Sequence, residues 1–244
     1  MSDLKYSSKM KTRNLLIIST ALIFCSYSLL RKSPVEVADT AVMLNYTVYG
    51  INSYRVCGVL KNTSDKTLVF PVLKVSLPSV ANSLMHTVTG CIVPAGESRY
   101  FLTGGEGIDS FVPPIEISYL YSDNRIEKAY VARQLKYLPK LSCTDVYFDS
   151  SDTGRGGSLR YRFVNNSDLR IGSIQATAVF FDEEGTLIAA WAFHSTKLDN
   201  PEGKHYVMDI ENGQRVVRAE IQIDTFIEEG DMPNQRVAVP PSVE

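Results

Sequence analysis

The three histidines, His86, His194 and His205, are the first candidates for metal binding or proton transfer in this 244-residue chain. A zinc site needs His, Cys or carboxylate ligands at short characteristic spacings, and none of the three histidines stands in such a spacing. His194 follows the run Ala-Ala-Trp-Ala-Phe, which is typical of a strand. We therefore expect a strand residue at position 194, and no metal ion or other cofactor.

An acidic cluster, Asp182, Glu183 and Glu184, stands in the stretch FFDEEGT. Calcium takes six or more oxygen ligands, and a calcium-binding loop continues with spaced acids and a distal Glu, which this stretch lacks. The turn of a hairpin explains the cluster better than a calcium site does.

Nucleophile and phosphate motifs are also missing. The chain has no Gly-x-Ser-x-Gly motif, and the glycine-rich stretch TGRGGSLR (153–160) lacks the Lys-Ser/Thr ending of a P-loop. We expect this stretch to be a flexible connection that precedes a strand. Since no nucleophile, metal or cofactor motif is present, the sequence predicts a protein that is not an enzyme.

Four arginines near this stretch suggest a small basic face. They are Arg155, Arg160, Arg162 and Arg170. Arg160 and Arg162 alternate with apolar residues that a strand would bury, so both should point outward. A solvated outer face is the simpler interpretation, and contact with an anionic glycan or a lipid headgroup is the alternative.

The stretch TGGEGIDSFVPP (103–114) is the second unusual segment, because it combines glycines, a Phe and two prolines. The loops at the ends of β-sandwiches commonly bind ligands, which makes Gly104, Gly105, Gly107 and Phe111 a possible binding loop. A slack connection between two strands is the other interpretation.

The N-terminal run from Asn14 to Leu30 is uncharged and largely apolar. As a helix it would reach about 25 Å, near the lower limit for crossing a bilayer. The excess of Lys and Arg before the run predicts a cytoplasmic N-terminus (1–13) and an extracytoplasmic bulk, in the periplasm or at the cell surface. An uncleaved membrane anchor is the main prediction, and a cleaved signal peptide that releases a secreted protein is the alternative.

Composition excludes some classes of partner. The net charge is −2, and the hydrophobic content of 44% is that of a foldable globular chain. A chain with this charge carries no general electrostatic attraction for nucleic acid, so we expect no nucleic-acid partner.

Beyond the N-terminal run, short β-branched and aromatic segments are separated by Gly, Pro, Asn, Asp or Ser about every ten residues. This spacing predicts antiparallel strands, and we expect an all-β chain of two tandem immunoglobulin-like β-sandwiches after a single transmembrane helix.

Two copies of one unit are indicated by landmarks that recur in the same order. The triplet Asn62, Ser64 and Asp65 recurs 103 residues later as Asn165, Ser167 and Asp168. The Pro-x-Gly and Glu-Ile pairs recur at nearly the same spacing. The expected boundaries are a linker at 31–43, β-sandwich domain 1 at 44–137, β-sandwich domain 2 at 138–230 and a C-terminal tail at 231–244.

The recurring Asn has a physical role at the end of a strand. Its side chain can bond to the backbone two residues on, and Ser and Asp can do likewise, so the chain reverses without unpaired donors. We therefore expect both triplets to be turns between strands.

The stretch YRFVNNSDLRIGSIQATAVFFDEEGTLIAAW resembles the FxLYD-type module of exported and membrane-anchored bacterial proteins. Phe181, Asp182 and Gly185 stand where that module has its hairpin. The first copy departs from the pattern after VLKVSL. The resemblance implies an immunoglobulin-like sandwich, and it transfers no functional residues.

Cys57 aligns with Arg160 in the second copy, so we expect it on an outward, solvent-facing side of its strand. Cys91 is expected to point inward. Opposite faces disfavour a Cys57–Cys91 disulfide, although an oxidising compartment would support one. Cys143 is expected to be a lone thiol.

These features together predict a membrane-anchored, non-catalytic binding or assembly protein that scaffolds an envelope complex. It would contact the membrane through its N-terminal helix and a protein partner through its sandwiches. The alternative is a module that binds the cell wall or another glycan.

Overall fold

A computed structural model of the chain describes residues 33–46, 52–76, 84–106, 116–122, 126–150, 156–196, 202–207 and 216–231. In these residues the chain forms antiparallel β-sheets with one α-helix and two short 3-10 helices, which confirms the all-β prediction. Within the same ranges no helix has the length and apolar character needed to span a bilayer. The expected anchor from Asn14 to Leu30 lies outside the described residues.

The first copy contains two three-stranded sheets, ordered β1-β2-β7 and β5-β4-β8, and a small β3-β6 pair. Its strands are β1 (Val35–Tyr46), β2 (Asn52–Asn62), β3 (Leu68–Val69), β4 (Val72–Ser76), β5 (Leu84–Val88), β6 (Ile92–Val93), β7 (Ser98–Glu106) and β8 (Glu116–Tyr121). The prediction of a linker at 31–43 is wrong, because β1 already begins at Val35. Alternating residues of this segment enter the core, as a strand requires.

The second copy repeats the two three-stranded sheets, in the orders β13-β10-β9 and β12-β11-β14. Its strands are β9 (Leu141–Ser150), β10 (Gly157–Asn165), β11 (Ile171–Phe181), β12 (Leu187–Ser195), β13 (Glu202–Val207) and β14 (Arg218–Glu228), followed by the 3-10 helix η2 (Glu229–Asp231). Strands β9, β10 and β13 take the places of β1, β2 and β7. Strands β11, β12 and β14 take the places of β4, β5 and β8.

Both copies carry the same β-bulge in their first strand. Asp39 and Asp145 have positive φ values of 49° and 52°. At each Asp the register shifts so that two residues oppose one on the neighbouring strand. Asp tolerates the left-handed region better than most residues, which suits it to a bulge. The repeat therefore includes the first strand of each copy.

The two Asn-x-Ser turns are built from the same hydrogen bonds. In each turn the Asn side-chain oxygen accepts bonds from the backbone and hydroxyl of the Ser two residues on, and the Asn amide donates to a carbonyl four residues on. These residues are Asn62, Ser64 and Lys66 in the first copy, and Asn165, Ser167 and Leu169 in the second. Asp65 and Asp168 lie exposed at the tips of the turns.

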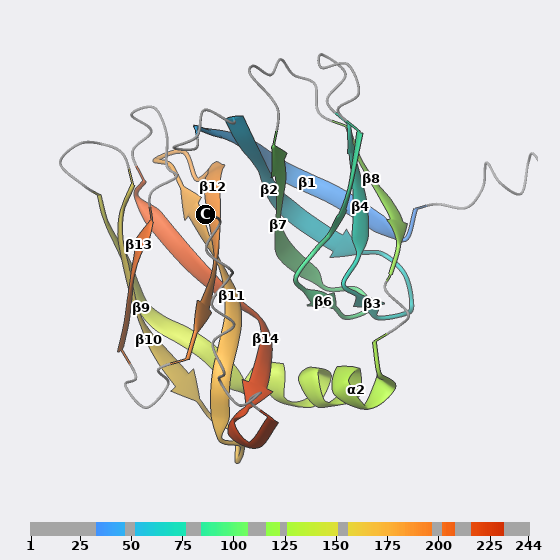
Figure 1. Cartoon of the computed structure of the whole chain (residues 1–244), viewed down its shortest axis with the longest axis vertical. Coiled ribbons are helices and arrows are strands. Elements are labelled where there is room, and N and C mark those ends of the chain that lie inside the picture. Colours follow the sequence, from blue (N-terminus) through green and yellow to red (C-terminus); the bar gives the residue numbers. More distant parts are fainter. Residues whose placement is uncertain are drawn as a thin grey trace, which may run out of the picture. The chain divides into compact units, whose positions relative to one another are not determined.

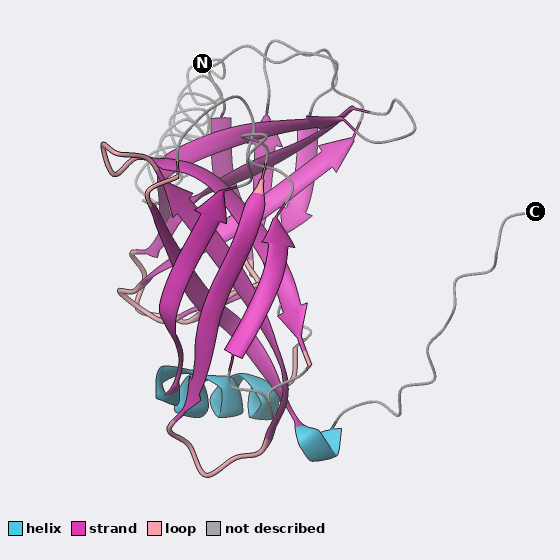
Figure 2. Ribbon diagram, turned by 90° about the vertical axis from the view of Figure 1, so that its left-hand side faces the viewer, coloured by secondary structure: helices cyan, strands magenta, loops and turns pink. Residues whose placement is uncertain are grey.

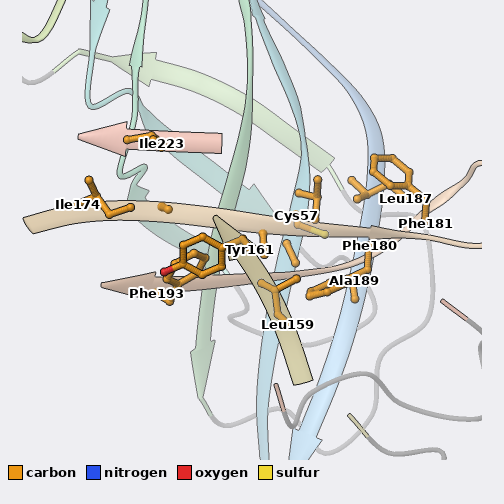
Figure 3. Packing of buried hydrophobic residues seen from close by; sticks show 14 of the residues in the cluster. Cys57, Leu159, Tyr161, Ile174, Phe180, Phe181, Leu187, Ala189, Phe193 and Ile223 are labelled. Carbon is orange, nitrogen blue, oxygen red and sulfur yellow. The ribbon is translucent and has the colours of Figure 1, made fainter. Parts of the chain in front are cut away.

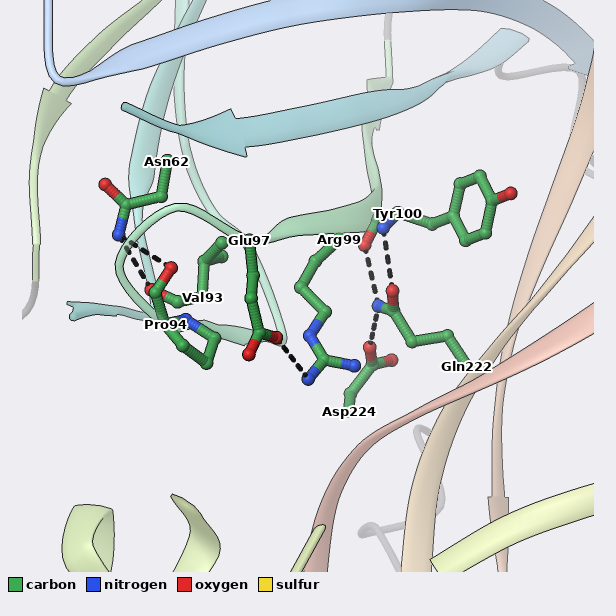
Figure 4. Close-up of polar contacts among 8 residues, drawn as sticks. All are labelled: Asn62, Val93, Pro94, Glu97, Arg99, Tyr100, Gln222 and Asp224. Carbon is green, nitrogen blue, oxygen red and sulfur yellow. Dashed lines mark hydrogen bonds and ion pairs between the residues drawn. The ribbon is translucent and has the colours of Figure 1, made fainter. Parts of the chain in front are cut away.

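The turns differ in burial. Asn62 is fully buried, and its amide nitrogen also lies 3.0 Å from the carbonyl oxygens of Val93 and Pro94. Figure 4 shows these two bonds holding the β6 region against the end of β2. Asn165 is exposed, and its side chain makes only the bonds of its own turn among those found in the described residues.

Strand β10 shows why this sequence forms a strand with one buried face. Leu159, Tyr161 and Phe163 are buried, while Arg160 and Arg162 between them are exposed, as predicted. The apolar face of β10 joins a hydrophobic cluster with residues of β11 and β12, and Phe148 of β9 meets Phe180 of β11 edge to face with ring centroids 5.1 Å apart. Burying such side chains stabilises the fold by about 2 kcal/mol each.

Strand β11 is buried on both faces, which a single pair of sheets does not explain. The side that carries Ile174, Ala176 and Phe180 faces the core of the second copy. Thr177 and Phe181 on the other side are also buried. In Figure 1 the sheet of β12, β11 and β14 lies between the sheet of β9, β10 and β13 and the first copy. The first copy therefore covers the outer face of β11.

A helix joins the copies at residues that the sequence analysis assigned to the end of β-sandwich domain 1. Helix α2 (Lys128–Tyr137) and the 3-10 helix η1 (Leu138–Lys140) lie across the ends of the strands (Figure 2). The side chain of Gln134 donates to the Phe226 carbonyl at 2.8 Å and accepts from the Phe226 amide at 3.1 Å. The side-chain amide of Gln134 thereby forms the pair of hydrogen bonds with the Phe226 backbone that a neighbouring strand would form.

The two Asn turns offer a matched test of burial. Asn62→Ala leaves buried carbonyl oxygens without a donor, so we expect a loss of about 3 kcal/mol in the free energy of unfolding, whereas Asn165→Ala should lose about 1 kcal/mol. Urea unfolding of both variants and the wild type measures the difference. Equal losses would contradict the role given to the buried bonds.

Candidate functional site

The junction between the copies is centred on the side-chain amide of Gln222 in β14. Gln222 Oε1 accepts a bond from the backbone amide of Tyr100 at 2.8 Å, and Gln222 Nε2 donates to the Tyr100 carbonyl at 3.0 Å. Figure 4 shows both bonds. Tyr100 lies in β7, the edge strand of its sheet, so the amide satisfies backbone groups that would otherwise remain unpaired at that edge.

Asp224 lies beside Gln222 and is buried. Its carboxylate accepts bonds from the Thr177 hydroxyl and from Gln222 Nε2, both at 2.6 Å. Burial raises the pKa of Asp224 to about 6, although these two bonds and the positive charge of Arg99 act in the opposite direction. Asp224 is therefore a buried titratable group at the contact between the copies.

Arg99 brings positive charge to the same place from β7. Its Nη2 atom lies 3.2 Å from a carboxylate oxygen of Glu97, while its buried Nε atom has no hydrogen-bond partner among the described residues. The buried thiol of Cys91 lies in the field of both Arg99 and Asp224, and burial raises the pKa of that thiol to about 12.

The ring of Tyr100 completes the contact. It meets Phe181 of β11 in an edge-to-face arrangement with centroids 6.3 Å apart, and its hydroxyl donates to Glu220 at 3.0 Å. Burial and the bond to Glu220 raise the pKa of Tyr100 to about 12. The contact thus combines apolar packing with polar bonds.

The expectation that Cys57 faces solvent is wrong. Cys57 is fully buried, and it belongs to the hydrophobic cluster of the second copy (Figure 3). It does point away from the core of its own copy, which contains Cys91, and the three described cysteines are free thiols. Nearby, the Arg55 guanidinium lies 4.7 Å from the centre of the Trp191 ring. The outward face of β2 is covered by the second copy.

The residues at equivalent positions in the two copies explain why the outer face of β2 is buried against another sheet and the outer face of β10 is not. Cys57 and Val59 in β2 correspond to Arg160 and Arg162 in β10, 103 residues later. An apolar face can be buried against another sheet, whereas closely spaced exposed arginines resist burial. Strands β9 and β10 therefore present their outer face to solvent.

This open face, formed by β9 and β10, carries an exposed aromatic ring between ion pairs. Tyr147 is 60% exposed and lies directly opposite Arg160. Arg160 lies 3.9 Å from Asp149, and Arg162 lies 3.5 Å from Asp145. Of the four arginines that suggested a basic face, Arg160 and Arg162 are therefore paired with acids here, and this face is electrically mixed. Arg170 lies 4.0 Å from Glu229, and Arg155 lies outside the described residues.

The other residues proposed from the sequence lie apart from both places. Gly104 and Gly105 belong to strand β7 rather than to a loop, and Gly107 and Phe111 lie outside the described residues. His194 lies in β12, as expected. The transmembrane limits Asn14 and Leu30 and the tail from residue 232 onward also lie outside the described ranges.

The acidic stretch after β11 is a hairpin turn, as expected. Asp182 Oδ1 accepts bonds from the backbone amides of Glu184 and Thr186 at 3.0 and 2.8 Å. Gly185 has a φ of 78°, which glycine adopts without strain. The Asp182 carboxylate is thereby used in closing the turn. Within the described residues no cluster of three His, Cys, Asp or Glu side chains could hold a metal ion.

The junction was missed in the sequence because β14 has the pattern of a strand with a solvated face. Glu220, Gln222 and Asp224 alternate with Ile221 and Ile223, which normally indicates polar residues facing water. A signal for the open face was present, since Tyr147 interrupts an otherwise polar face between Asp145 and Asp149.

Comparison with protein-family models, with curated proteins and with solved structures finds no significant match to this chain.

Asp224 should make stability depend on pH. Its pKa of about 6 in the folded state lies above the value of 3.8 for an ordinary Asp. The folded state therefore binds the proton more tightly, and the free energy of unfolding should rise by about 2 kcal/mol as pH falls from 7 to 4. Asp224→Asn should lose this rise.

The measurement is urea unfolding of the wild type and Asp224→Asn between pH 4 and 7. Subtracting one free energy of unfolding from the other removes the contribution of all other titrating groups. A difference that stays constant over this range would show that Asp224 has an ordinary pKa when folded.

Proposed function

We propose that the chain is a membrane-anchored, extracytoplasmic binding and assembly protein that scaffolds an envelope complex and has no catalytic activity. Its two copies are immunoglobulin-like β-sandwiches of the FxLYD type. The N-terminal segment holds them at the membrane, and a protein partner binds to them.

The observation that carries this proposal is the junction between the copies. Copies joined by a free linker would move independently, whereas here Gln222 and Glu220 of the second copy bond directly to Tyr100 of the first. Both copies belong to one compact unit. A unit of this kind keeps its exposed surfaces at a fixed spacing, which a scaffold requires and a flexible tether does not.

The buried polar groups of the junction are also better placed for structure than for chemistry. Asp224 and Thr177 are buried and bonded to each other, and Gln222 is engaged with backbone on the other copy. The side chains of these three residues find their hydrogen-bond partners within the protein, which suits a permanent contact between two sheets. This arrangement supports a binding protein over an enzyme.

Membrane attachment is tested on the full chain. After carbonate extraction of membranes we expect the protein in the pellet with its intact mass of 27.2 kDa. The physical reason is the apolar run from Asn14 to Leu30, which is long enough to cross a bilayer as a helix. A soluble product that lacks about the first 28 residues would establish the secreted alternative.

The scaffold role is tested by loosening the junction. Gln222→Ala removes both bonds to Tyr100, so we expect several-fold lower recovery of partner protein when the full chain is purified from cross-linked membranes. Glu184→Ala, at the exposed hairpin tip, is the control and should leave recovery unchanged. Mass spectrometry identifies and quantifies what is recovered.

Equal recovery with Gln222→Ala and the wild type would show that the fixed arrangement of the copies is not needed. Retention of the chain on isolated cell-wall polysaccharide, without a protein partner, would favour the glycan-binding alternative instead.

A further inference from the structure

The outer face of β9 and β10 occupies the position that forms the contact between copies in the first half of the chain. In the first copy this position is filled by Ala41 and Cys57, which are paired across β1 and β2 and face the second copy. In the second copy the corresponding pair is Tyr147 and Arg160. The same face is therefore covered by another sheet in the first copy and exposed in the second.

The open face carries more than the charges needed to prevent another sheet from stacking on it. A face that merely prevents stacking needs charges, and Arg160 and Arg162 supply them. Tyr147 adds a large exposed ring at the centre of those charges. Tyr and Arg are among the residues most enriched where proteins bind one another, because both bring large contact areas with polar ends.

The charges on this face have a self-complementary arrangement. Both arginines lie on β10, and both acids, Asp145 and Asp149, lie on the neighbouring β9. When two such faces meet about a two-fold axis, the arginine row of one can lie over the acidic row of the other. A two-fold interface requires such self-complementarity, because the same patch is used on both subunits. If a residue of one subunit contacts a given residue of the other, the reverse contact is also made.

Exchanging partners in this way costs little. The ion pairs within the face are 3.9 and 3.5 Å long, and all four side chains are more than half exposed. Exposed pairs of this kind contribute about 0–1 kcal/mol each. The same groups can therefore pair across a contact, where water is excluded and the interaction is stronger.

We propose that the β9–β10 face is a homodimer interface that binds the same face of a second copy of this chain, with the two Tyr147 rings at its centre. The dimer is reversible, because Tyr147 and the charged Arg160 replace the apolar Ala41 and Cys57 of the permanent contact. The dimer does not depend on the partner protein of the envelope. The dimer proposal and the proposed scaffold function can therefore be disproved independently of each other.

Charge reversal tests the interface. The acidic variant is Arg160→Glu with Arg162→Glu, and the basic variant is Asp149→Lys with Asp145→Asn, since Asn tolerates the positive φ at position 145. Light scattering of the full chain in detergent gives its mass at several concentrations, and thermal unfolding checks that each variant is folded.

We expect a concentration-dependent dimer for the wild type, monomers for each variant alone, and a heterodimer when the two variants are mixed. Tyr147→Ala should raise the dissociation constant of the dimer about tenfold or more. The double reversal Lys66→Glu with Arg170→Glu, in the exposed turns away from this face, should leave the dimer intact.

Three results would overturn the proposal. The wild type could remain monomeric at every concentration, or a dimer could survive in each variant alone, which would place the contact elsewhere, including the N-terminal run. The third is a monomer whose retention on a neutral oligosaccharide column requires Tyr147, which would assign the face to a glycan.

Discussion

The amide of Gln222 pairs with the backbone of Tyr100 as one strand pairs with another, and this contact decides how the rest of the protein is built. It closes the free edge of β7 and brings the sheet of β1, β2 and β7 against β11. Because that sheet then covers β11, residues such as Thr177 and Phe181 are buried on a face that would otherwise meet water. Asp224 follows from the same contact, since its carboxylate is held by Gln222 and Thr177.

Burying a carboxylate at this contact has a cost that apolar residues would avoid. Removing a charge from water destabilises the folded state, and the raised pKa of Asp224 expresses that penalty. Polar bonds at the contact fix the relative position of the two sheets, because sheets that touch through apolar side chains alone can slide past each other. Asp224 accepts a bond from Gln222 and so orients the amide that pairs with the Tyr100 backbone. These bonds to Tyr100 are satisfied at one alignment of the sheets, so the copies have one arrangement.

The two copies share local backbone conformations and differ in the residues on their outer faces. The bulges at Asp39 and Asp145 and the bonds of the two Asn turns are the same, because they are set by local conformation. The outer faces have diverged, with Cys57 and Val59 in one copy and Arg160 and Arg162 in the other. That divergence gives the second copy an open face of its own.

The sequence by itself determined what depends on neighbouring residues: the all-β class, the alternation of Leu159, Tyr161 and Phe163, the Asn-x-Ser turns and the acidic hairpin at Asp182. Their signals lie within a few residues because strand period and turn chemistry are local. The tertiary structure alone decided that Cys57 is covered, that Gln222 and Asp224 are buried, and that α2 bonds to β14. A strand's sequence shows which side chains share a face, and only the packing of distant segments decides whether that face meets water or another sheet.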